Sequence, residues 1–147
     1  MRTSSCLLAL VLVVTLAGCG GSNNTPTNIG LFGNWNVVMY PTGSSTASYV
    51  FGLALSQEGS NYSGGSIVYN GSVPAPTNMC IDPNTLRATA TTSGSNFDMT
   101  ITDATTNTVI SVTGTLASQT GQLSGTYSNG ASTACTASQG TVVMSPQ

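Results

Sequence analysis

The chain has 147 residues, of which 39% are hydrophobic and only 4% are charged. It contains no histidine and no lysine, which excludes histidine-based catalytic triads, histidine-rich metal sites, Schiff bases and phosphate-loop lysines. Because Arg2 and Arg87 are its only cations, the sequence also lacks the basic surface that nucleic-acid binding requires. The length fits one ordinary domain, whose polar positions are filled mainly by serine, threonine and asparagine.

Residues 1–18 have the pattern of an export signal. Arg2 gives a positive start, and the apolar stretch 7–17 is too short for a bilayer, which needs roughly 20 apolar residues. The stretch ends in Leu16-Ala17-Gly18-Cys19, which resembles the lipobox of bacterial lipoproteins. The resemblance implies cleavage before Cys19 and attachment of fatty chains such as palmitate to this cysteine. The alternatives are a plain secretory signal and an apolar N-terminal helix.

The segment 19–29 that follows the box is polar and has the composition of a flexible tether. The resemblance therefore implies a protein of the cell envelope that is anchored to a membrane through lipid on Cys19. In bacteria with two membranes, Gly20 in place of aspartate implies sorting to the outer membrane, on its periplasmic or its surface face.

Two cysteines remain once Cys6 leaves with the signal and Cys19 takes the lipid. In an exported protein, Cys80 and Cys135 are expected to form a disulfide, and two buried free thiols are the alternative. Two cysteines without partners of the right type do not indicate a metal site, and we expect neither a metal nor another cofactor.

From residue 30 onward, apolar and polar residues alternate, as in Tyr49, Phe51, Leu53 and Leu55, and this is the pattern of half-buried strands. Glycine-containing turns, such as those around Gly59 and Gly94, separate the alternating runs. The expected strands cover residues 31–40, 47–57, 62–70, 84–92, 97–103, 107–116, 122–128 and 140–145. The segment 30–147 is therefore predicted to be one all-β, antiparallel domain.

Closure into an up-and-down barrel of about eight strands is favoured over a β-sandwich, because almost no charge is present to protect open sheet edges. Two irregular stretches, 70–84 and 129–139, contain Cys80 and Cys135, and in such a meander both lie at the same end. Gly33-Asn34-Trp35 in the first strand resembles the calycin barrels, which include lipocalins and avidins. The arginine that lipocalins place late in the chain against this tryptophan has no equivalent here.

The carboxylates of the mature chain are few, and their positions favour structural roles. Glu58 lies in a predicted turn, Asp98 alternates with apolar neighbours and should face outward, and Asp103 should cap the following turn. Asp82 fits an Asx-type turn better than a calcium loop. Arg87 should point outward, where it either pairs with a surface carboxylate or binds an anionic partner.

Several aromatic residues at inward positions either fill the barrel or line a cavity for a small apolar ligand, with a filled core favoured. They are Trp35, Tyr49, Phe51, Phe97 and Tyr127. The sequence thus predicts an anchored envelope lipoprotein with a non-enzymatic binding or interaction domain, which uses hydroxyl-rich faces and the two cysteine-containing loops. Its partner would be a small apolar ligand or an envelope protein. A carboxylate-dependent hydrolase of cell-wall or polysaccharide material and a passive coating protein are the alternatives.

Overall fold

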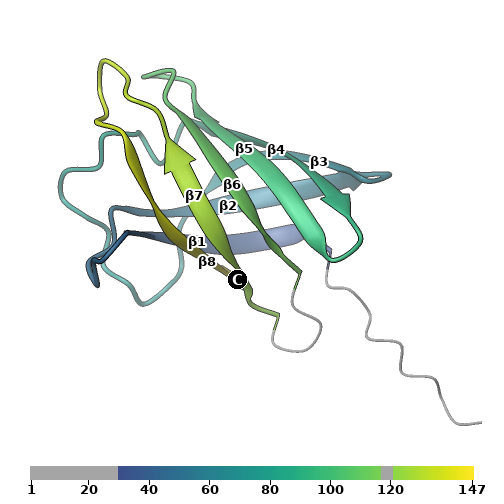
Figure 1. Cartoon of the computed structure of the whole chain (residues 1–147). Coiled ribbons are helices and arrows are strands. Elements are labelled where there is room, and N and C mark those ends of the chain that lie inside the picture. Colours follow the sequence, from purple (N-terminus) through teal and green to yellow (C-terminus); the bar gives the residue numbers. More distant parts are fainter. Residues whose placement is uncertain (1–29, 117–120) are drawn as a thin grey trace, which may run out of the picture.

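The computed structural model describes residues 30–116 and 121–147, and these form an antiparallel barrel that is closed between its first and last strands (Figure 1). Each strand pairs with its neighbours in the sequence, as in an up-and-down meander. The strands are β1 (Gly33–Pro41), β2 (Tyr49–Glu58), β3 (Asn61–Ile67), β4 (Leu86–Ser93), β5 (Asn96–Asp103), β6 (Val109–Thr115), β7 (Leu123–Asn129) and β8 (Ser138–Pro146).

The predicted all-β, eight-stranded barrel is confirmed, and the sandwich alternative does not describe the fold. β1 pairs with β2 on one side and with β8 on the other, through seven residue pairs each, so neither β1 nor β8 is an open edge. Two of the predicted glycine turns are also present, with φ angles of 63° at Gly59 and 60° at Gly94. These left-handed conformations favour glycine, and they connect β2 to β3 and β4 to β5 with two residues each.

Alternation along the strands places one set of side chains inside the barrel. A single buried cluster runs through the interior and includes residues from every strand. Trp35 anchors the entry of β1, because its indole Nε1 donates a hydrogen bond of 2.8 Å to the carbonyl oxygen of Leu31. The inward face of each strand is thus fixed by the burial of its apolar residues.

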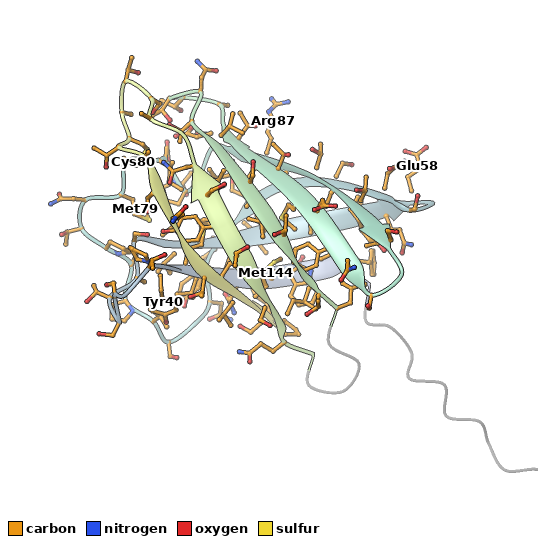
Figure 2. All side chains as sticks on the ribbon, in the orientation of Figure 1. Tyr40, Glu58, Met79, Cys80, Arg87 and Met144 are labelled. Carbon is orange, nitrogen blue, oxygen red and sulfur yellow. A yellow bond between two sulfur atoms is a disulfide. The ribbon has the colours of Figure 1, made fainter. Side chains whose placement is uncertain are left out.

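The two ends of the barrel differ in their connections. The hairpin end carries the turns after β2 and β4, and β6 also ends there; the chain enters the barrel at the same end, at Gly30. The loop end carries the connections after β1, β3, β5 and β7. Figure 2 shows Glu58 at the hairpin end and Cys80 at the opposite end.

The connection between β3 and β4 closes the loop end and also wraps around the barrel. Its Ile81 lies in the interior cluster, while Tyr69 and Val73 pack on a second cluster that includes the outward Val38 and Val50. β3 therefore ends at Ile67, three residues earlier than expected. Its chain leaves the sheet to cover the outer face of β1 and β2.

Candidate functional site

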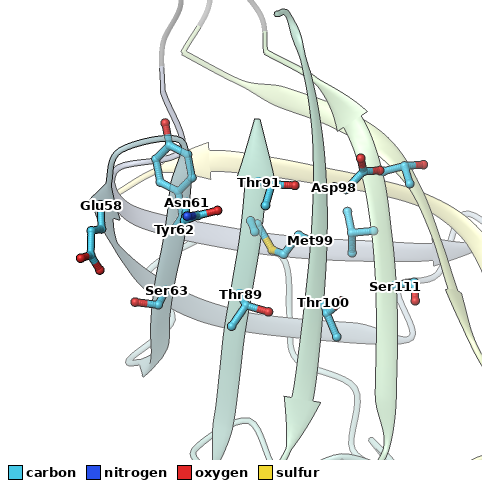
Figure 3. Close-up of a pocket in the computed structure, with 13 residues that line it drawn as sticks. Glu58, Asn61, Tyr62, Ser63, Thr89, Thr91, Asp98, Met99, Thr100 and Ser111 are labelled. Carbon is cyan, nitrogen blue, oxygen red and sulfur yellow. The ribbon is translucent and has the colours of Figure 1, made fainter. Parts of the chain in front are cut away.

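A furrow of about 570 Å³ crosses the outer wall of the barrel over β3, β4, β5 and β6 (Figure 3). We call it the hydroxyl furrow, because hydroxyl groups predominate among the polar side chains that line it. Those polar side chains belong to Glu58, Asn61, Tyr62, Ser63, Thr89, Thr91, Asp98, Thr100, Ser111 and Thr113.

The strand register arranges these side chains in two rows that run across the strands. The first row consists of Ser63, Thr89, Thr100 and Ser111, and the second of Asn61, Thr91, Asp98 and Thr113. Neighbours within a row are about 4.8 Å apart, and the two rows are separated by about 6.7 Å along the strands. The furrow therefore presents a regular lattice of hydrogen-bonding groups.

Two further furrows, of about 740 and 370 Å³, adjoin the first one at Thr113. The larger lies over a glycine pair, Gly114 on β6 and Gly125 on β7, which are register partners. A Cβ atom at Gly125 would lie 2.1 Å from the carbonyl oxygen of Thr113, and one at Gly114 would lie 2.7 Å from the ring of Phe97. At both positions, the absence of a side chain allows the close approach of the neighbouring strand and of this ring.

Most hydroxyls of the two rows are free to bind a partner. Among the described residues, the one side-chain hydrogen bond from these rows joins Thr113 and Thr126, with 3.1 Å between their Oγ1 atoms. The threonines at the loop end are different, because their hydroxyls form hydrogen bonds within the protein.

Asp103 is the centre of that loop-end network and is almost fully buried, with 1% of its surface exposed. Its carboxylate accepts hydrogen bonds from the backbone N–H of Asp82 (2.9 Å) and Thr105 (2.8 Å), and from the hydroxyls of Thr85 and Thr106 (2.7 Å each). Burial by itself would raise the pKa of this carboxyl, but the four hydrogen bonds outweigh it and lower the pKa to about 2. The predicted turn cap is confirmed, and its link to the connection between β3 and β4 was not foreseen.

The remaining charged groups do not converge on one point. Asp82 forms the predicted Asx turn, in which its Oδ1 accepts the N–H of Asn84 at 2.9 Å. Asp98 and Arg87 are exposed on the outer wall, as expected. Glu58 shares the furrow with Asp98, but they lie three strands apart, which is about 14 Å between their Cα atoms. No cluster of three potential metal ligands occurs in residues 30–116 and 121–147.

The predicted disulfide between Cys80 and Cys135 is present, with an S–S distance of 2.04 Å. It joins the connection after β3 to the connection after β7 at the loop end. The Oγ1 atom of Thr108 lies 3.5 Å from the sulfur of Cys135, and Tyr49 approaches that of Cys80 to the same distance. Together with the Asp103 network, the bond holds this end of the barrel closed.

The aromatic residues that were predicted to line a cavity or fill the core all lie inside the barrel, in one buried cluster. They are Trp35, Tyr49, Phe51, Phe97 and Tyr127, each with no more than 3% of its surface exposed. Tyr49 and Tyr127 stack edge to face with their ring centroids 5.8 Å apart. Burial, and secondarily the nearby Tyr127, raises the pKa of Tyr49, which donates a hydrogen bond to Asn129 at 3.2 Å. A cavity for a small apolar ligand stays a prediction.

The lipobox with Cys19 lies outside the described residues. The part of the chain that the structure does describe contains no helix of the length and apolar character needed to cross a membrane. No family model, no curated protein and no solved structure matches this chain.

Proposed function

We propose that this chain is a lipoprotein of the bacterial envelope whose barrel is a non-enzymatic binding module, anchored to a membrane by lipid on Cys19. The anchor rests on Leu16-Ala17-Gly18-Cys19, on the apolar stretch before it and on the polar tether after it. Gly20 supports sorting to the outer membrane.

One observation carries the binding role: a hollowed outer wall whose hydrogen-bonding side chains have few partners within the protein. The chain enters the barrel at Gly30, at the hairpin end, so a tether attached there leaves the wall and the loop end accessible. A barrel with satisfied buried groups and an open polar wall is suited to holding a partner.

The geometry gives less support to a carboxylate-dependent hydrolase. Paired carboxyl groups in glycosidases face each other across one cleft, roughly 5 to 10 Å apart, whereas Glu58 and Asp98 lie three strands apart, on β2 and β5. Figure 3 shows these two carboxylates at opposite sides of the furrow. Asp103 has a lowered pKa and a full set of hydrogen bonds, so it is a poor proton donor at neutral pH.

Metabolic labelling with radioactive palmitate tests the anchor. We expect label on the protein and recovery in the membrane fraction, at the outer-membrane density in a bacterium with two membranes. Cys19→Ala should abolish the label and leave the precursor uncleaved. An unlabelled wild-type chain that is free in the cytosol would contradict the proposal. Release of reducing ends from cell-wall or polysaccharide material, lost in Asp98→Asn, would favour the hydrolase instead.

A further inference from the structure

We infer that the hydroxyl furrow binds a linear, uncharged polysaccharide whose chain runs across β3, β4, β5 and β6. This inference rests on the proposed binding function and names the partner of that same wall. It is carried by the charge of the furrow, by the spacing of its rows and by the availability of its hydroxyls.

The charge of the furrow selects against acidic partners. Its two ionised groups, Glu58 and Asp98, are both carboxylates, and no arginine is among the residues that line it. A phosphorylated or uronate-containing polymer would meet only like charge there. Sugar hydroxyls instead donate hydrogen bonds to a carboxylate such as Asp98, and bonds of that kind are stronger than those between neutral groups.

The spacing of the rows suits a repeating chain better than a single small molecule. A polymer that crosses the strands meets a new hydroxyl, amide or carboxylate about every 4.8 Å, and in two parallel rows. Threonine also contributes a methyl group beside each hydroxyl, so that Thr89, Thr91 and Thr100 can contact the C–H face of a sugar ring while they bond its hydroxyls. An isolated sugar would use only a fraction of the lattice.

The hydroxyls of this wall are available to a ligand, whereas those at the loop end are not. Thr85 and Thr106 already donate to Asp103, at 2.7 Å each. Within the described residues, Thr91 and Thr100 make no side-chain hydrogen bond of their own, and both are exposed. Binding at the furrow therefore breaks no contact that the fold needs, and the strands position the hydroxyls beforehand.

The test measures retention of the protein, purified from membranes in a detergent without a sugar headgroup, on insoluble cellulose, chitin and curdlan. An alginate gel serves as the anionic control. We expect saturable binding to at least one neutral polymer and none to alginate. Thr91→Val/Thr100→Val keeps the shape of both side chains and removes two hydroxyls, so the affinity should fall by about tenfold. Thr133→Val removes an exposed hydroxyl from the connection after β7 and should change nothing.

Three outcomes would overturn the inference: no retention on any of the neutral polymers, stronger retention on alginate, or unchanged affinity in the double variant. Thermal unfolding checks that the variants fold, and Ser111→Ala, which removes the hydroxyl of the neighbouring strand, provides an independent second variant with the same expected direction. Palmitate labelling reports on the anchor separately. A chain that is lipidated but ignores neutral polymers would therefore refute the partner and leave the anchored module standing.

Discussion

Replacing Asp103 by asparagine tests whether one buried carboxylate holds the loop end of the barrel together. In the wild-type fold, this carboxylate accepts four hydrogen bonds, from the connection after β3 and from the turn after β5. Asparagine keeps one oxygen and presents an NH₂ group where the second oxygen was. Two of the four donors would then face a donor, which leaves a part-buried backbone N–H without a partner.

The size of the effect follows from the pKa of Asp103. The difference between its ordinary value of 3.8 and about 2 in the fold corresponds to roughly 2.5 kcal/mol of stability at neutral pH. With the unsatisfied donor added, we expect Asp103→Asn to lower the free energy of unfolding by about 2–4 kcal/mol. Because the folded pKa lies below the unfolded one, this contribution is complete above about pH 4. It is lost as the pH falls from about 4 to about 2.

The assay is urea unfolding of wild type and variant at pH 7, 4, 3 and 2, followed by tryptophan fluorescence from the buried Trp35. Asp98→Asn is the matched control, because the same change on the same strand affects an exposed side chain and should cost no more than about 0.5 kcal/mol. The difference between wild type and Asp103→Asn should shrink below pH 4. Equal costs for the two variants, or a difference that stays constant down to pH 2, would refute the reasoning.

Three further perturbations concern the disulfide, the glycine pair and a buried tyrosine. Changing Cys80 and Cys135 to alanine opens a loop of 55 residues and so raises the conformational entropy of the unfolded chain. This should lower the free energy of unfolding by about 4 kcal/mol, and an unchanged urea midpoint would contradict it. Gly125→Ala places a Cβ against backbone and should cost at least about 2 kcal/mol, whereas Thr126→Ala on the outer face should stay near wild type in the same thermal melts. Burial raises the pKa of Tyr49, so the free energy of unfolding should fall above pH 10, where this tyrosine ionises in the unfolded chain before it ionises in the fold. Tyr49→Phe should make that fall shallower in alkaline unfolding curves. Identical curves for the two proteins would show that the phenol contributes nothing.

The strands could be predicted because the burial of one face leaves a period of two in the sequence. Phe97, Met99 and Ile101 are buried, whereas Asp98 between them is exposed, as their alternation indicates. The pairing of Cys80 with Cys135 could be predicted from the expectation of export and from the parity of the connections. Each of these inferences uses only the order of residues along the chain, together with the strong preference of apolar side chains for the interior.

The furrow and the Asp103 network depend instead on which distant residues meet. In the sequence, Gly114 and Gly125 are two ordinary inward positions. Only the structure shows that they are register partners and that the ring of Phe97 packs beneath Gly114. Asp103 reads as a local turn cap, although half of its donors come from a segment about twenty residues earlier. The local sequence pattern does not show which distant residues come into contact, since these contacts are set by the path of the connections.

Val38 and Val50 show that alternation along a strand can also mispredict which side chains are exposed. Both occupy outward positions, where alternation predicts exposure, and both are buried because the connection after β3 covers them. This covering explains why the outer faces of β1 and β2 are apolar near the loop end, whereas the polar wall begins at Glu58, where β2 ends. β1 and β2 can carry apolar residues on both faces only where that connection lies over them, and β4, β5 and β6 have no such cover.

A chain with so little charge has two ways to keep its sheet from pairing with other sheets, and this one combines them. Closure between β1 and β8 removes the open edges that charge would otherwise protect. The outer face must then be made polar without ions, and threonine does this at the positions where a β-branched side chain also favours the strand. The hydroxyl lattice is thus a consequence of folding a nearly uncharged barrel. What folding alone does not require is that this wall be furrowed: the hollow over Gly114 and Gly125 adjoins the hydroxyl furrow at Thr113, so that a partner lying there meets a concave surface.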